Sequence, residues 1–291
     1  MPEGPWGDSS ALYLLVKGVA SGVLLLIVIA GFSGLGESAF LSWGGALIGV
    51  GLTVLSAMTL AGSWRLPRRV LFLLGYADLE SWQVRGAWIL AAQALVGLLW
   101  AFAALVGWAW LLALLTIPVA CVALLTACYS TFLCCPSGAE GEGALVRQDR
   151  SVGALLLVSH GFVAGAAFLL LTGLAFGSLP VQTERGFLRF ALWGGLLGHL
   201  FSVVLAMRRG MVVPHRRLSL VRKIRTAGAE SRRFWGLVVV GALVAIACLA
   251  AAGTGEDGTS TVFAAILALL SAWAWSALWV RTAPASPGSV M

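Results

Sequence analysis

Five polar side chains lie within long apolar stretches of the sequence, each in a different stretch. They are Lys17, Gln93, Tyr129, His160 and His199. A polar or titratable group is costly in hydrocarbon unless it finds hydrogen-bond partners or water. Histidine, lysine and tyrosine can also give up and regain protons. These residue types therefore predict a buried polar pocket that holds a ligand with carbonyl oxygens and moves protons at them.

The elements that position these residues must be transmembrane helices. Of the 291 residues, 60% are apolar and 11% are charged, whereas soluble domains carry about 25% charged residues. A helix needs roughly 20 apolar residues to cross the hydrocarbon core. We predict an all-α polytopic membrane protein, a single domain of eight transmembrane helices in a bundle. The spans are 11–32, 38–61, 86–106, 109–134, 152–177, 187–207, 234–253 and 261–280.

The third and fourth spans form one almost continuous apolar stretch. We divide this stretch at Gly107-Trp108, because glycine favours a turn and tryptophan favours the membrane interface. Without that division the chain would have seven spans.

Basic residues fall almost entirely on one side of the predicted spans. Of the 19 Lys and Arg residues, only Arg185 and Arg189 lie in loops of the opposite side, and Lys17 lies inside the first span. Basic loops are retained in the cytoplasm. We therefore expect a multi-pass protein of the inner membrane with both termini in the cytoplasm. The net charge of +7 then reflects topology and contact with membrane lipids, and we expect no nucleic acid partner.

The five polar residues fall at a common depth. Counted from the basic side at about 1.5 Å per residue, each lies roughly 8–12 Å inside its span. No Asp or Glu falls within a span, which argues against an ion-coupled pump with a carboxylate relay. A quinone has an apolar ring and tail with two carbonyl oxygens, and it enters from the lipid. We interpret the five residues as candidate quinone ligands.

Each of these residues also has a structural interpretation. Lys17 can extend its amine to the interface, and Tyr129 can belong to the interfacial aromatic belt. Gln93 and the histidines can hydrogen-bond a neighbouring helix. His160 and His199 also raise bis-imidazole haem ligation. A dihaem protein needs four such histidines and the chain has three, so no haem is expected.

Motifs of a self-contained enzyme are absent from the sequence. It has no Walker motif, nucleophile elbow or carboxylate pair. The cysteines lack CxxC spacing, so we expect no iron–sulfur cluster and no metal site in this chain. They are Cys121, Cys128, Cys134, Cys135 and Cys248.

The loop 62–85 between the second and third spans is unusual. Its apolar run 70–74 lies between arginines and Trp82, which predicts a short helix lying in the membrane interface. A simple connector on the membrane surface is the plainer alternative. Loop 208–233 is strongly basic, which is typical of a topology signal but also suits an acidic partner.

Six segments together resemble the polysulfide-reductase and dimethyl-sulfoxide-reductase type of membrane anchor, a quinol-interacting subunit of molybdopterin oxidoreductase complexes. The resemblance covers most of residues 11–207. The segments are ALYLLVKGVASGVLLL (11–26), LPRRVLFLL (66–74), SWQVRGAWIL (81–90), ACYSTFL (127–133), SHGFVAGAA (159–167) and GLLGHLFSVVL (195–205).

The resemblance implies an eight-helix anchor without haem that exchanges electrons between the quinone pool, menaquinone or ubiquinone, and a ferredoxin-like iron–sulfur subunit. It also implies a molybdopterin catalytic subunit beyond that partner. The chain would then be a quinol-reacting or non-catalytic subunit of an oxidoreductase complex in a respiratory chain. The residues expected to dock the partner are Arg65, Arg68, Arg69, Trp82 and Arg85.

The sequence departs from the family pattern at two places. Trp64 and Arg65 stand where many members carry an acid or histidine, and no Glu follows His199 in the sixth span. Both departures remove candidate proton carriers. Two other functions therefore stay open: a scaffold of a redox complex without a quinone site, and a transporter. A transporter would favour an internal repeat, and we find no convincing repeat in the sequence.

Overall fold

The computed structural model describes residues 8–36, 38–63, 82–131, 143–177, 182–208, 231–232, 234–252 and 258–282. Eight apolar helical segments in this part of the chain are long enough to cross a membrane. The predicted all-α, multi-pass membrane fold is therefore confirmed. The predicted interfacial helix falls mostly on residues 64–81, outside the described residues.

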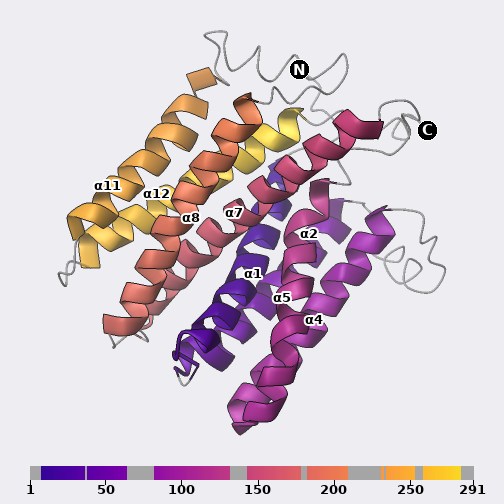
Figure 1. Cartoon of the computed structure of the whole chain (residues 1–291), viewed down its shortest axis with the longest axis vertical. Helices are drawn as coiled ribbons and strands as arrows, with labels where there is room; N and C mark the ends of the chain where they lie inside the picture. Colours follow the sequence, from indigo (N-terminus) through magenta and orange to yellow (C-terminus); the bar gives the residue numbers. More distant parts are fainter. Residues whose placement is uncertain are drawn as a thin grey trace.

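The helices form two sets of four. The first set comprises α1 (Asp8–Phe32), α2 (Gly45–Ser63), α4 (Trp82–Val106) and α5 (Ala109–Cys128), and a short π-helical segment, η1 (Phe40–Gly44), leads into α2. The second set comprises α7 (Gly143–Ala175), α8 (Gln182–Arg208), α11 (Gly241–Ala252) and α12 (Gly258–Thr282), and the π-helical η2 (Phe234–Val240) precedes α11. Figure 1 shows the first set at the lower right and the second at the upper left.

The chain turns back at a glycine after three of the described helices. Three glycines with positive φ follow the ends of α1, α4 and α7: Gly34 at 76°, Gly107 at 77° and Gly177 at 61°. Glycine adopts this left-handed conformation at little cost, so it commonly ends a helix. The predicted division at Gly107 is confirmed, because α4 ends at Val106 and α5 begins at Ala109.

Within each set of four helices, the contacts between neighbouring helices form a closed cycle, and both cycles follow the order of the chain. In the first set α1 contacts α2, α2 contacts α4, α4 contacts α5, and α5 returns to α1. In the second set α7, α8, α11 and α12 make the equivalent cycle. The sets join through α1 and α7, and α1 also touches α12 as α7 touches α5. This is an internal structural repeat, which the sequence analysis missed because hydropathy alone does not show which helices touch.

The central position of α1 explains its burial. Of the residues in its most apolar stretch, 83% are buried, compared with 28% for α5 and for the η2–α11 span. The peripheral helices keep their remaining apolar side chains at the surface, as expected where that surface faces lipid. The basic end of the molecule, the end where α1 begins and α12 ends, lies at the top of Figure 1.

Candidate functional site

Lys17 forms the first of two buried polar centres. Its side chain is 1% exposed, although an amine in hydrocarbon is costly. The Nζ atom donates to the hydroxyl of Ser130 and to the carbonyl oxygen of Ala127, the latter at 3.4 Å. It also lies 4.4 Å from the ring centroid of Tyr129. Lys17 therefore points into the bundle, and snorkelling to the interface does not describe it.

Local structure places Tyr129 against Lys17. Tyr129 directly follows α5, and its backbone N–H still bonds to Leu125 O at 2.9 Å, so the residue continues the helical turn. Its ring is held on the other side by α4: a Cβ atom at Gly86 would lie 2.6 Å from Tyr129 Cε2. Only glycine lets α4 approach the ring this closely without a shift of one of them.

The second polar centre consists of His160, His199, Trp275 and Ser276. The His160 Nε2 atom and the Ser276 hydroxyl are 3.2 Å apart and hydrogen-bonded. The rings of His160 and His199 have centroids 5.9 Å apart, and those of His199 and Trp275 are 6.0 Å apart. Both histidines are 2% exposed. Three helices, α7, α8 and α12, therefore bring four polar or aromatic side chains together.

The two centres meet where α1 crosses α7. A Cβ atom at Gly22 would lie 1.9 Å from Gly161 O, and one at Gly165 would lie 2.5 Å from the Gly22 carbonyl carbon. The backbones therefore touch, as small residues allow between membrane helices. Gly18, the neighbour of Lys17, would place a Cβ atom 3.2 Å from His160 Cδ2. Lys17 and His160 therefore lie close to this crossing, one on each of the two contacting helices.

The centres are equivalent under the structural repeat. Lys17 and His160 each precede a glycine on the first helix of their set. Each side-chain nitrogen bonds a serine that directly follows an aromatic residue: Ser130 follows Tyr129 just beyond α5, and Ser276 follows Trp275 within α12. Ser276 and Trp275 are not among the site residues predicted from the sequence. The parallel between Tyr129-Ser130 and Trp275-Ser276 is the signal that would have found them.

Several polar atoms of the two centres lack hydrogen-bond partners among the described residues. They are the Tyr129 hydroxyl, His160 Nδ1 and both ring nitrogens of His199, and the nearby Tyr13 hydroxyl shares this property. An unpaired buried polar group costs about 1–3 kcal/mol. Such groups in a native protein indicate water or a ligand that completes their hydrogen bonds. This unmet capacity is the strongest physical indication of a binding site in the structure.

Apolar side chains surround these polar atoms. Leu90 from α4, Leu156 from α7 and Phe234 from η2 belong to one buried cluster with Tyr129 and Trp275. Apolar walls with a few polar groups are typical of sites for small organic ligands. The set of polar groups, a lysine amine, a phenol and two imidazoles, can hydrogen-bond and exchange protons with the oxygen atoms of a ligand.

Gln93 takes a different position from the other four candidate ligands. Its side-chain Nε2 donates to Thr53 Oγ1 at 2.8 Å across the contact between α2 and α4, and Thr53 donates to Gly49 O. Gln93 thus joins two helices of the first set, in agreement with the alternative prediction that it hydrogen-bonds a neighbouring helix. Its Oε1 atom has no partner among the described residues.

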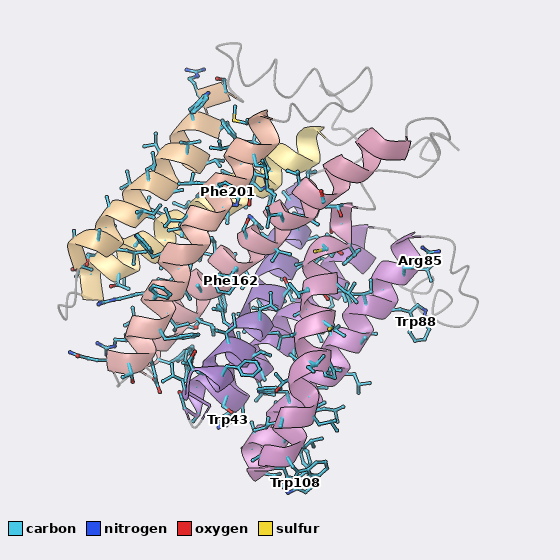
Figure 2. All side chains as sticks on the ribbon, in the orientation of Figure 1. Trp43, Arg85, Trp88, Trp108, Phe162 and Phe201 are labelled. Carbon is cyan, nitrogen blue, oxygen red and sulfur yellow. The ribbon has the colours of Figure 1, made fainter. Side chains whose placement is uncertain are left out.

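The expected docking residues are described only in part. Arg65, Arg68 and Arg69 lie outside the described residues, and Trp82 begins α4 without a described side chain. Arg85 is exposed on the first turn of α4. Figure 2 shows Arg85 and Trp88 at one end of α4 and Trp108 beyond its other end. Arg85 directly precedes Gly86, which contacts Tyr129, so this surface adjoins the Lys17 centre.

Searches for known relatives define no family for the chain. No family model matches it, and neither a curated protein nor a solved structure is significantly similar to it. Within the described residues, no group of three or more His, Cys, Asp or Glu side chains is arranged to hold a metal ion. Functional inference therefore rests on the fold, the two polar centres and the sequence motifs.

Proposed function

We propose that this chain is the membrane anchor of a respiratory-type oxidoreductase complex and exchanges electrons between the quinone pool and an iron–sulfur partner subunit. The observation that carries the proposal is the unmet hydrogen-bonding capacity of Tyr129, His160 and His199 beside buried Lys17. These groups lie toward the basic end of a membrane bundle and are buried among its helices.

Residues of both centres divide the work of binding. Lys17 and Tyr129 can donate hydrogen bonds to one quinone oxygen, and the imidazoles of His160 and His199 can accept or return a proton at the other. Bound quinone supplies reversible two-electron, two-proton chemistry. Ser130 and Ser276 hold the amine of Lys17 and the ring of His160 in place. The apolar walls exclude bulk water from the site.

The position of the site supports a partner at the basic end. Arg85 is exposed, and the adjoining Gly86 contacts the Tyr129 ring. An iron–sulfur subunit bound at this surface would sit directly above the Lys17 centre. In the family resemblance, a molybdopterin catalytic subunit lies beyond that partner and carries the substrate chemistry. We propose that the complex belongs to the inner membrane with the basic end in the cytoplasm.

Tyr129→Phe tests this proposal most cleanly. The hydroxyl has no partner among the described residues, so its loss should leave thermal stability unchanged. If the hydroxyl binds a quinone oxygen, the dissociation constant for a soluble short-chain quinol should rise about tenfold. Equal affinity in Tyr129→Phe and wild-type protein would argue against a quinone at this site.

A transporter is the second candidate, and the structural repeat favours it. Parallel repeats related by an axis along the membrane normal occur in transporters, with the substrate site at the repeat interface. Here the crossing of α1 and α7 places Lys17 and His160 at that interface. Solute uptake by proteoliposomes that contain the chain alone, without any redox partner, would support transport over the anchor function.

A further inference from the structure

A cavity of about 340 Å³ lies at the opposite end of the bundle from Lys17. It is open on one side and is lined by the last turns of α1, by η1, by α4 near Trp100 and by the first turns of α5. Its volume falls at the lower end of the range for small-ligand pockets, about 300–1,000 Å³. Most of its lining is apolar, including Ile27, Leu41 and Leu112, and no charged residue lines it.

Two polar side chains in the cavity wall have unmet hydrogen-bonding capacity. Trp100 is 5% exposed, and its Nε1 donor has no acceptor among the described residues. Ser42 lies in the π-helical turn η1, where its backbone N–H bonds to Ser38 O at 2.9 Å; no hydrogen bond of its hydroxyl is found in the described part of the chain. Thr116 differs, because its hydroxyl is satisfied by Leu112 O at 2.8 Å. The wall thus offers two hydrogen-bond donors.

The cavity lies at the ends of the membrane-spanning helices. α1 ends at Phe32 and α5 begins at Ala109, and both residues line the cavity. Three tryptophans are exposed around this end: Trp43, Trp108 and Trp110 at 37%, 43% and 67%. Figure 2 shows Trp43 and Trp108 toward the same lower end of the molecule. Such aromatic residues mark the level of the lipid headgroups, where acyl chains carry their ester carbonyl groups.

We propose that this cavity is a phospholipid site. One acyl chain occupies the apolar space, and its ester carbonyl oxygen accepts hydrogen bonds from the Ser42 hydroxyl and the Trp100 indole. The apolar lining suits a hydrocarbon chain, and the absence of charged lining residues excludes recognition of the headgroup phosphate within the cavity. The site is independent of quinone binding, since it lies in the other leaflet from Lys17.

The test is a titration of delipidated full-length protein in detergent with dioleoyl phosphatidylglycerol, followed by native mass spectrometry. We expect one tightly bound lipid per wild-type chain. Trp100→Phe removes the donor but keeps an aromatic ring, and should weaken that lipid about fivefold. Ala113→Phe fills the cavity from α5 and should abolish it. Trp110→Phe, an exposed tryptophan at the same end that does not line the cavity, should bind as the wild type does.

Two results would overturn the phospholipid assignment. In the first, Ala113→Phe and Trp100→Phe retain lipid as tightly as Trp110→Phe does. In the second, the molecule extracted from wild-type protein, and missing from Ala113→Phe, is a quinone, which also presents a carbonyl acceptor. A thermal melt of each variant in the same detergent separates loss of the site from loss of the fold.

Discussion

Lys17 shows how a single side chain can be both costly and necessary. It is buried at the centre of a membrane bundle, against the ring of Tyr129 and the hydroxyl of Ser130. A structural role alone gives no reason to prefer an amine here, because an apolar residue of similar length would fill the space without the desolvation cost. The proposed quinone site supplies a reason for the amine, because a ligand oxygen could accept its hydrogen bond.

Lys17→Met should separate binding from folding. Methionine keeps the unbranched apolar stem, and Ser130 can turn its hydroxyl to a carbonyl of its own helical turn. We expect the melting temperature in detergent to stay within a few degrees of wild type or to rise. Quinol affinity should fall at least tenfold, as measured by equilibrium titration.

Leu12→Met provides the control for this substitution, because Leu12 is exposed on the same helix. It should leave both stability and quinol affinity unchanged. A Lys17→Met protein that unfolds readily while the remaining folded fraction binds quinol normally would show that Lys17 serves packing alone.

The sequence predicts these residues better than it predicts their partners. Lys17, Tyr129, His160 and His199 stand out because polar groups are rare in apolar spans, and the structure brings all four to the region around the crossing of α1 and α7. Ser276 escapes notice because a serine in a membrane helix usually bonds its own backbone. Only the packing of α12 against α7 reveals its bond to His160.

At the scale of elements, the contact between α1 and α7 determines the site. Glycines on both helices allow the backbones to touch. Hydropathy predicts where each helix begins and ends, because it reports transfer from water to lipid. It does not predict which helices touch, since lipid and neighbouring helices are equally apolar. The eight spans were therefore predictable, whereas the two cycles of four were not.

Gly22→Ala should destabilise the bundle at this contact. The added methyl group would lie 1.9 Å from Gly161 O, and relieving such an overlap forces the helices apart at a cost of about 1–3 kcal/mol. We expect a melting temperature lower by several degrees, with weaker quinol binding as the two centres separate.

Gly51→Ala is the matched control for the helix contact. Gly51 lies within α2, and a Cβ atom there would meet nothing within 4 Å. Alanine also favours the helix over glycine, so this variant should be as stable as wild type or more so. If Gly22→Ala is as stable as Gly51→Ala, the backbones of α1 and α7 do not pack as closely as the structure describes.

At the scale of the whole molecule, the repeat places function at an interface. Both sets of four helices run in the same order, and α1 and α7 start from the same end. Lys17 and His160 occupy equivalent places in the two sets but differ in chemistry. Amine and imidazole thus contribute different proton affinities to one region.

The topology of the chain gives a prediction at this scale. The distribution of Lys and Arg predicts that the basic end lies in the cytoplasm. Green fluorescent protein fused after Met291 should therefore fluoresce, and alkaline phosphatase fused after Trp108, beyond the turn at Gly107, should be active in cells. The opposite orientation would give the reverse pattern. Green fluorescent protein after Met291 would then be dark and alkaline phosphatase after Trp108 inactive, whereas alkaline phosphatase after Met291 would be active.

The most direct test of the redox-anchor proposal is mild-detergent purification of the tagged chain from its native membrane, with mass spectrometry of the proteins and lipid-soluble molecules that co-purify. The predicted result is a near-stoichiometric subunit with ferredoxin-like cysteine motifs, together with bound quinone. A chain that purifies alone and carries no quinone would contradict the proposal and make transport the leading function.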